Sequence, residues 1–237
     1  MPTPSVDSIT SGVKSSSGTG TCTLSTSTAD DWIIIAVYNE VTSGSAPAVS
    51  AVTSSNLTFS FYYRSNSSAK GSMEIWKAKA SGTLSSEVIS ITWATGFDDA
   101  TFFALGVKDC NASDPFDPNA SLPAKNSGGA GAWTPSITVS TDNPNDLFLV
   151  FFGTPTSGAG TPVTPTSFSR LLTATNAGGT LFSTLAMDTR SVSSTQSSYT
   201  VVASAGGNSV DAGESIIIAM TEGAVSSSRA SDFMIMM

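Results

Sequence analysis

The sequence predicts an all-β protein built from two tandem antiparallel β-sandwich lobes of the jelly-roll or immunoglobulin-like kind. Only 12% of the residues are charged, and Ser, Thr, Gly and Ala take their place, which is typical of strands and turns. Short apolar segments alternate with Gly, Pro, Asn and Ser at the spacing of antiparallel sandwiches, roughly 8–12 residues. No window of about ten residues shows a helical stripe, so we expect little helix.

An internal repeat relates the two lobes. Asp31 aligns with Asp146 at an offset of 115 positions (146 − 31), and each precedes an apolar run. Asp109 aligns with Glu222 at an offset of 113 positions (222 − 109), and each follows such a run. Two anchors in the same order at nearly the same offset indicate a duplicated β unit.

Candidate strands lie between these anchors in each copy. The runs 33–37, 147–152 and 215–219 are essentially apolar throughout, so we expect central strands covered on both faces. Several of the remaining strands alternate apolar and polar residues, as half-buried strands do. They are 56–64, 71–78 and 88–93 in the first copy, and 167–173, 180–187 and 199–203 in the second.

The predicted organisation is a first lobe over 1–110, a linker over 111–132, a second lobe over 133–223 and an extended C-terminal tail over 224–237. Three prolines and a Gly-rich stretch mark the linker. Each copy has enough strands to close a two-sheet core of its own. In the alternative arrangement, the two copies share one large pseudo-symmetric sandwich.

The composition excludes most catalytic chemistry. Because the chain has no histidine, it lacks Ser-His-Asp and Cys-His relays and cannot ligate a metal through imidazole. Two cysteines are too few for a thiolate metal cluster. Carboxylates remain as acid–base groups, but nothing in the sequence pairs them. We therefore expect no enzyme activity and no cofactor.

Charge and hydropathy also restrict the partners. A net charge of −8 argues against binding to phosphate backbones, so we expect no nucleic acid partner. The first residues lack the basic start and apolar stretch of a secretory signal peptide. The longest apolar runs fall far short of the ~20 residues that span a bilayer. We expect no membrane association, and assembly in a host cytoplasm, as for virus particles, fits this pattern.

Five segments share the order and character of a known pattern: 30–36, 73–78, 102–107, 114–117 and 145–150. Over roughly residues 18–222 they resemble a loosely defined group of two-lobed β-sandwich proteins found widely in bacteriophage and bacterial genomes. The chain departs from that group's pattern because it lacks a Pro-Pro-Ala-Gly-Trp turn ahead of the middle strands. The resemblance implies the fold and, for many such proteins, a place in a phage virion or a bacterial surface module.

The two cysteines allow two interpretations. Cys22 opens the first shared strand, and Cys110 closes the last strand of the first copy. If these two strands are antiparallel neighbours, the cysteines lie close enough for a disulfide. Alternatively, both are small apolar side chains in a reducing compartment.

An acidic turn and several aromatic residues are candidate ligand sites. Asp114, Asp117 and Asn119 supply oxygen atoms that calcium accepts, but their spacing matches no established calcium loop, and a structural turn is favoured. Four tryptophans and two adjacent tyrosines suit a sugar-stacking platform. Trp32 and Trp76 align with packing positions of the repeat and are expected in the core. The side chains that remain open as ligand aromatics are Tyr62, Tyr63 and Trp133.

The C-terminal tail ends in an apolar tip. A polar stretch follows Glu222, and the chain then finishes with Phe233, Met234, Ile235, Met236 and Met237. An apolar run on a polar tether is an association hazard unless it docks. Methionine adapts to irregular grooves, so we favour docking into another subunit, by strand addition or groove insertion. The alternative is that the tail folds back onto its own lobe.

These observations favour a non-enzymatic virion structural protein of a bacteriophage, either a capsid decoration protein or a tail- or fibre-associated component. Its partners would be other virion proteins and its own copies. The alternative is a surface or secreted β-sandwich module that binds a carbohydrate or a host receptor.

Overall fold

The structure, a computed structural model, describes residues 2–66, 70–128, 133–155, 162–178, 182–204 and 213–223. Its regular elements in these ranges are fifteen β-strands joined in antiparallel pairs. No helix in this part of the chain is long and apolar enough to cross a bilayer. The strands form two lobes, β1 to β8 and β9 to β15, which confirms the predicted all-β, two-lobed fold.

The first lobe consists of a five-stranded inner sheet and a three-stranded outer sheet. The strand order is β1-β8-β3-β6-β5 in the inner sheet and β2-β7-β4 in the outer sheet. The strands are β1 Ser5–Ser15, β2 Thr19–Leu24, β3 Trp32–Glu40, β4 Val49–Thr53, β5 Ser60–Ser65, β6 Gly71–Lys79, β7 Glu87–Trp93 and β8 Asp99–Lys108.

The second lobe repeats this plan with a shorter outer sheet. Its inner sheet has the order β12-β13-β11-β15-β9, and its outer sheet is the pair β10-β14. The strands are β9 Ala124–Ser127, β10 Ser136–Val139, β11 Asp146–Pro155, β12 Ser169–Asn176, β13 Ser183–Ser191, β14 Tyr199–Val202 and β15 Glu214–Thr221.

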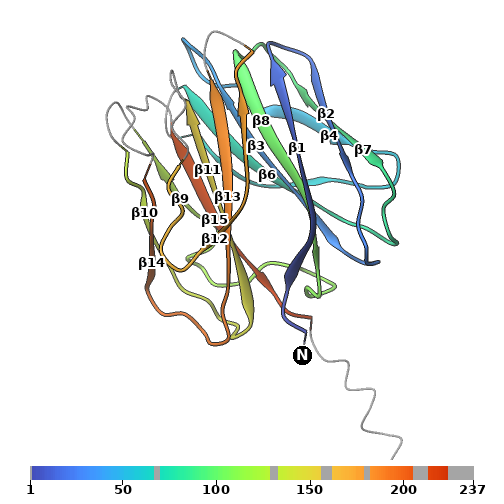
Figure 1. The fold of residues 1–237 in the computed structure, drawn as a ribbon, viewed down its shortest axis with the longest axis vertical. Helices are drawn as coiled ribbons and strands as arrows, with labels where there is room; N and C mark the ends of the chain where they lie inside the picture. The colour runs from blue at the N-terminus through green and yellow to red at the C-terminus, as the bar shows by residue number, and fades with distance from the viewer. Residues whose placement is uncertain are drawn as a thin grey trace, which may run out of the picture.

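The four sheets stack as layers, with the two inner sheets face to face (Figure 1). The outer pair β10-β14 lies on one side of the stack, and the outer sheet β2-β7-β4 lies on the other. Each lobe has a core between its own two sheets. A third core, here called the central core, lies between the inner sheets and takes side chains from both lobes. Each lobe therefore closes a core of its own, and the two lobes share a third.

Position in this stack accounts for the continuous apolar runs. Every residue of β3 and β15 is buried, as is every residue of β11 except Pro155. In β3, alternate side chains such as Ile33 and Ile34 enter the first-lobe core and the central core in turn. Such strands need apolar residues on both faces, so the prediction that these runs are central strands is confirmed.

The repeat extends to strand order and local detail. The order β9-β15-β11-β13-β12 follows β1-β8-β3-β6-β5 strand for strand. β1 lies against β12 and β5 against β9 across the central core, as a twofold relation between the lobes requires. The backbone oxygen of Asp31 accepts a 2.9 Å hydrogen bond from the N–H of Ala80, which follows β6. The backbone oxygen of Asp146 accepts one of the same length from Val192, which follows β13. Ser86 and Ser198 share a positive φ before β7 and β14.

Part of the predicted linker belongs to the second lobe. β9, within 111–132, pairs with β15 and forms an edge of the inner sheet. Isolated bridges also join Cys110 to Glu222 and Phe116 to Met220. The segment is therefore fastened along β15, although its Pro and Gly content is typical of a linker.

Four edge strands carry a register irregularity. It lies between Val6 and Ser8 in β1, between Val49 and Ala51 in β4, and at the corresponding places in β5 and β12. Such bulges twist an edge and hinder pairing with another chain. Association by strand addition is therefore disfavoured at these edges.

The close approach of the inner sheets at Gly153 can be tested. A Cβ atom there would lie 2.2 Å from the Tyr38 ring, so Gly153→Ala should destabilise the protein by roughly 1–3 kcal/mol through overpacking. Gly82, with nothing within 4 Å of its added Cβ, provides the matched control Gly82→Ala. Thermal unfolding measures both, and equal melting temperatures would contradict the packing of Tyr38 on Gly153.

Candidate functional site

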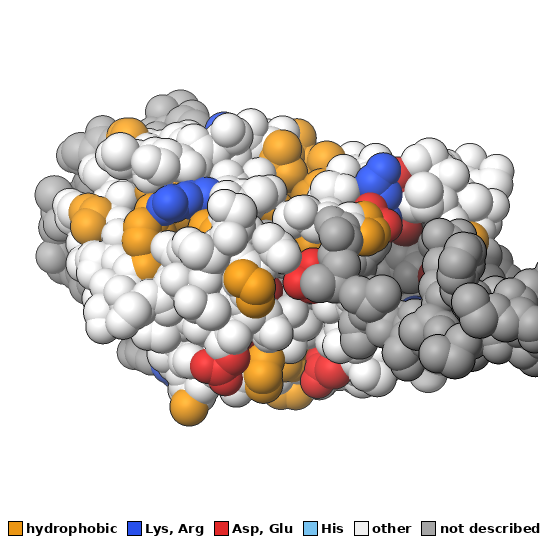
Figure 2. All heavy atoms as spheres, turned by 90° about the horizontal axis from the view of Figure 1, so that it is seen from below, with side chains coloured by type: hydrophobic (Ala, Val, Ile, Leu, Met, Phe, Trp, Pro, Cys, Tyr) orange, Lys and Arg blue, Asp and Glu red, His pale blue; other side chains and the backbone are white. Residues whose placement is uncertain are grey.

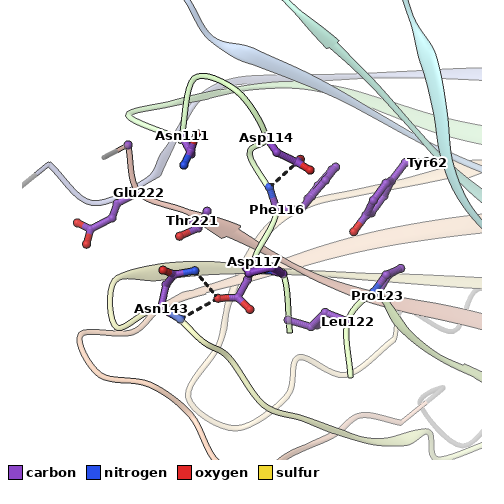
Figure 3. Close-up of a pocket in the computed structure, with 12 residues that line it drawn as sticks. Tyr62, Asn111, Asp114, Phe116, Asp117, Leu122, Pro123, Asn143, Thr221 and Glu222 are labelled. Carbon is purple, nitrogen blue, oxygen red and sulfur yellow. Dashed lines mark hydrogen bonds between the residues drawn. The ribbon is translucent and has the colours of Figure 1, made fainter. Parts of the chain in front are cut away.

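A cleft of about 780 Å³ lies where segment 111–123 meets the end of β15. We call it the junction cleft. Its wall combines apolar and acidic side chains, as Figure 3 shows. Seen from below, the molecule presents hydrophobic and acidic groups scattered over a largely uncharged surface (Figure 2). Its lining includes Tyr62, Asp114, Phe116, Asp117, Leu122 and Glu222.

Consecutive turns shape the segment that forms one wall. The side-chain oxygens of Asp114, Asp117 and Asn119 each accept a hydrogen bond from the backbone N–H two residues further on, at 3.4, 2.9 and 3.0 Å. Asp and Asn favour such turns because their short side chains reach their own backbone. Backbone hydrogen bonds then tie the segment to β15, for example from the Thr221 N–H to the Pro115 oxygen at 2.7 Å.

An aromatic stack under a lysine forms the apolar part of the cleft. The rings of Tyr62 and Phe116 are stacked with centroids 3.8 Å apart and an interplanar angle of 13°. Lys77 Nζ lies 4.9 Å from the Phe116 centroid and 5.4 Å from that of Tyr62. The same ammonium is 3.1 Å from Asp114 Oδ1. Cation–π attraction and this ion pair hold the lysine over the rings.

Asp117 is a carboxylate held by donors. Burial alone would raise its pKa, but hydrogen bonds from the backbone N–H groups of Asn119, Asp142 and Asn143, together with the Asn143 amide, hold it below the usual value. Its Oδ2 accepts from Asp142 and Asn143 N–H at 3.0 and 2.9 Å. A carboxylate with several N–H donors stays ionised.

Asp146 lies beside this carboxylate and is fully buried. Burial raises the pKa of Asp146 to about 8, and the negative charge of Asp117, with which it shares a hydrogen bond, adds to the effect. Two carboxyl groups this close do not both ionise readily. A pKa of about 8 keeps Asp146 protonated at neutral pH.

The first lobe contains the same pair. Asp7 accepts hydrogen bonds from the Ser27 N–H and hydroxyl, and these lower its pKa against the effect of burial. Burial first, and then Asp7, raise the pKa of its neighbour Asp31 to about 6. Asp31 and Asp146 are the residues aligned by the repeat. Each lobe therefore places a buried carboxyl group with a raised pKa, Asp31 or Asp146, beside a carboxylate with a lowered pKa, Asp7 or Asp117.

The candidate calcium ligands are engaged in turns. Asp114 pairs with Lys77, Asp117 with backbone donors, and the Asn119 amide donates to Asp142 at 2.7 Å. No group of three or more acidic, Cys or His side chains in the described ranges is arranged to hold a metal ion. These observations favour the structural turn.

The cysteines are free thiols in different layers. Cys22, in β2 of the outer sheet, is buried in the first-lobe core, whereas Cys110 packs at the edge of the central core. Burial raises the pKa of both thiols to about 12. The disulfide alternative assumed that β2 lies beside β8, but β1 takes that place. In the structure both cysteines therefore pack as small apolar side chains.

The candidate ligand aromatics do not form one platform. Tyr62 lines the junction cleft, Tyr63 packs on the central core below Lys125, and Trp133 is buried against Gly128 and Gly213. Trp32 lies in the central core, as expected, and Trp76 is half-buried on the first-lobe core. The tail residues Phe233, Met234, Ile235, Met236 and Met237 lie outside the described residues.

Sequence reasoning missed Asp7, Lys77 and Phe116. Asp7 and Asp117 precede their partners by 24 and 29 positions (31 − 7 and 146 − 117) in segments without an apolar pattern. Aligning the turns Ser27-Thr28 and Asp142-Asn143 across the repeat is the signal that could have found the pairs. Lys77 and Phe116 come together only through the fold.

The carboxyl pairs make stability depend on pH. The folded chain holds the Asp146 proton up to about pH 8, whereas an unfolded aspartate loses it near pH 4. The contribution of Asp146 to stability is therefore fully present below about pH 4 and declines as the pH rises towards 8. We expect Asp146→Asn, which mimics the protonated acid, to flatten this decline by on the order of 5 °C in melting temperature.

Melting curves at intervals from pH 4 to pH 8.5 measure this effect, and the exposed Asp109→Asn is the matched control. Asp31 and Glu40, whose pKa values burial raises to about 6 and about 9, preserve part of the slope in the variant. Asp7, Glu87 and Asp117 have lowered pKa values, so their contribution to stability rises with pH and partly cancels the decline. An unchanged slope in Asp146→Asn contradicts the proton-sharing pair.

Comparisons of the chain with protein families, with curated proteins and with solved structures find no match in any of the three. They identify no family, and the structure shows an all-β protein with two multi-strand sheet regions.

Proposed function

We propose that the protein is a non-enzymatic structural component of an assembled particle, a bacteriophage virion, and acts through protein–protein contacts. A capsid decoration or a tail- or fibre-associated position fits the fold equally. The particle would assemble in the host cytoplasm, with other virion proteins and further copies of this chain as partners. The two uncharged outer faces of the molecule carry this proposal.

The outer faces lie on opposite sides of the layered stack (Figure 1). Among the outer-sheet strands the one charged residue is Glu87, and hydrogen bonds from Ser54 and Asn56 occupy its carboxylate. Val88 and Val202 are 53% and 50% exposed on these faces. Hydroxyl pairs such as Thr19 with Thr92, 3.0 Å apart, surround them. Depletion of charge is what distinguishes the centre of a protein interface.

The displaced pKa values support a structural role. Glu40, with a pKa of about 9, and Asp146, with a pKa of about 8, are both fully buried. Catalytic acids and bases must touch a substrate, whereas these side chains are enclosed by sheets. The carboxylate of Asp117, in the cleft wall, already accepts hydrogen bonds from the turn at Asp142 and Asn143. The carboxyl groups therefore serve the fold.

Purified particles from cells that carry the gene test this function. We expect the intact chain in a mass-spectrometric inventory, at a fixed copy number relative to the major capsid protein. Val88→Lys combined with Val202→Lys should lower that copy number roughly tenfold, because burying a lysine in an interface is costly. Val13→Lys, on a β1 position that is 47% exposed, is the matched control. Particles that lack the chain overturn the proposal.

The alternative, a surface or secreted module that binds a carbohydrate or a host receptor, is favoured by one aromatic patch. Phe61 is 51% exposed at the edge of the first inner sheet. Its ring meets Trp76 edge to face, with centroids 5.5 Å apart at 77°. Exposed aromatic faces beside polar groups suit a sugar ring. The bulge in β5 produces this arrangement, since it turns Tyr62 and Tyr63 inward.

A glycan array tests the alternative function directly. If the module binds carbohydrate, the chain should give defined hits, and Phe61→Ala should weaken them roughly tenfold through lost stacking. Leu171→Ala, a comparable exposed position on β12, should leave them unchanged. An array without hits, or hits that survive Phe61→Ala, rejects this patch as a sugar site.

A further inference from the structure

We propose that the junction cleft binds the apolar tip, residues 233–237, of a second copy of the chain. This inference rests on the proposed function, because it identifies one contact by which copies would join. The occupant is a segment of this chain, and the receptor is the cleft between segment 111–123 and β15.

The cleft has the size and the surface for such a peptide. Its volume of about 780 Å³ falls within the usual range for ligand sites, roughly 300–1,000 Å³. Tyr62 and Phe116 offer a stacked aromatic surface, and Leu122 continues the apolar wall. The tip is Phe-Met-Ile-Met-Met. Methionine contacts aromatic rings favourably and fills irregular spaces.

The position of the segment links it to this cleft. Gly223, the last residue that the structure describes, is itself part of the cleft wall. Residues 224–232 are Ser and Ala apart from Val225, Arg229 and Asp232, and nine residues span up to about 30 Å when extended. A segment that only folded back into its own cleft would not need a tether of that reach. The length is suited to a cleft on an adjacent copy.

Charge favours the same match. The cleft rim carries Asp114 and Glu222, and Glu222 Oε1 accepts from the Asn145 amide at 3.1 Å. Glu222 Oε2 is buried without a hydrogen-bond partner among the described residues. Arg229 precedes the tip by four positions and brings donors to this acidic rim. The tip itself carries no charged side chain, and the charge of Arg229 offsets that of Asp232, which directly precedes the tip.

Groove insertion is the mode that the cleft offers. Register irregularities in β1, β4, β5 and β12 hinder strand addition at those edges. Two copies that exchange tips reciprocally form a closed dimer, and one-way insertion builds a chain of copies. Both arrangements use the same contact.

Two variants, each of which lacks one side of the contact, test it. Deletion of residues 233–237 removes the tip and keeps the cleft, whereas Leu122→Glu keeps the tip and blocks the cleft. By sedimentation velocity the full chain should associate, and each variant alone should be monomeric. An equimolar mixture of the two should form a 1:1 complex, because each supplies what the other lacks. Leu171→Glu, on an exposed leucine of β12, should associate like the full chain.

A second measurement covers the case in which Leu122→Glu fails to fold. A fluorescent peptide of residues 229–237 should bind the tip-deleted chain, and Tyr62→Ala in that chain should weaken binding roughly tenfold. A monomeric full chain overturns the inference and indicates that the tip stays within its own molecule. Failure of both the mixture and the peptide to bind overturns it as well. The particle inventory is independent of these results, so the two proposals fail separately.

Discussion

Face-to-face packing of the two inner sheets is the constraint on which the rest of the structure depends. Each inner sheet is buried on both sides, so neither lobe can expose its inner face without placing large apolar side chains in water. Tyr38 from the first lobe sits on Gly153 of the second, where only a residue without a side chain fits. This packing relates the lobes by a twofold arrangement and brings segment 111–123 against β15, which creates the junction cleft.

Charged groups follow the same constraint. Several carboxyl groups of this chain lie where the sheets exclude water. Asp31 and Asp146 are two of them, and each lies beside a carboxylate, Asp7 or Asp117, whose pKa hydrogen-bond donors lower. The repetition shows that these pairs belong to the folding unit.

The parts of the fold that the sequence predicted correctly are those with strong patterns. β3, β11 and β15 were recognisable because burial on both faces requires continuous apolar residues, and the repeat offset located their partners. β1 and β9 were missed because Ser5–Ser15 and Ala124–Ser127 are edge strands with few apolar residues. That omission misplaced Cys22 beside β8 and made all of 111–132 a linker. The sequence pointed to three residues of the candidate site, Tyr62, Asp114 and Asp117. Their turn and aromatic character did not indicate that they line the same cleft.

By itself, the sequence determined that the chain is all-β, duplicated and without imidazole chemistry, because composition, strand periodicity and repeat spacing are local properties. The tertiary structure alone decided that two lobe cores are joined by a third, that Asp117 lies beside Asp146, and that Tyr62 and Phe116 stack in one cleft beneath Lys77. These contacts join residues far apart in the chain. Sheet packing brings them together, and no local pattern encodes the distance between two sheets.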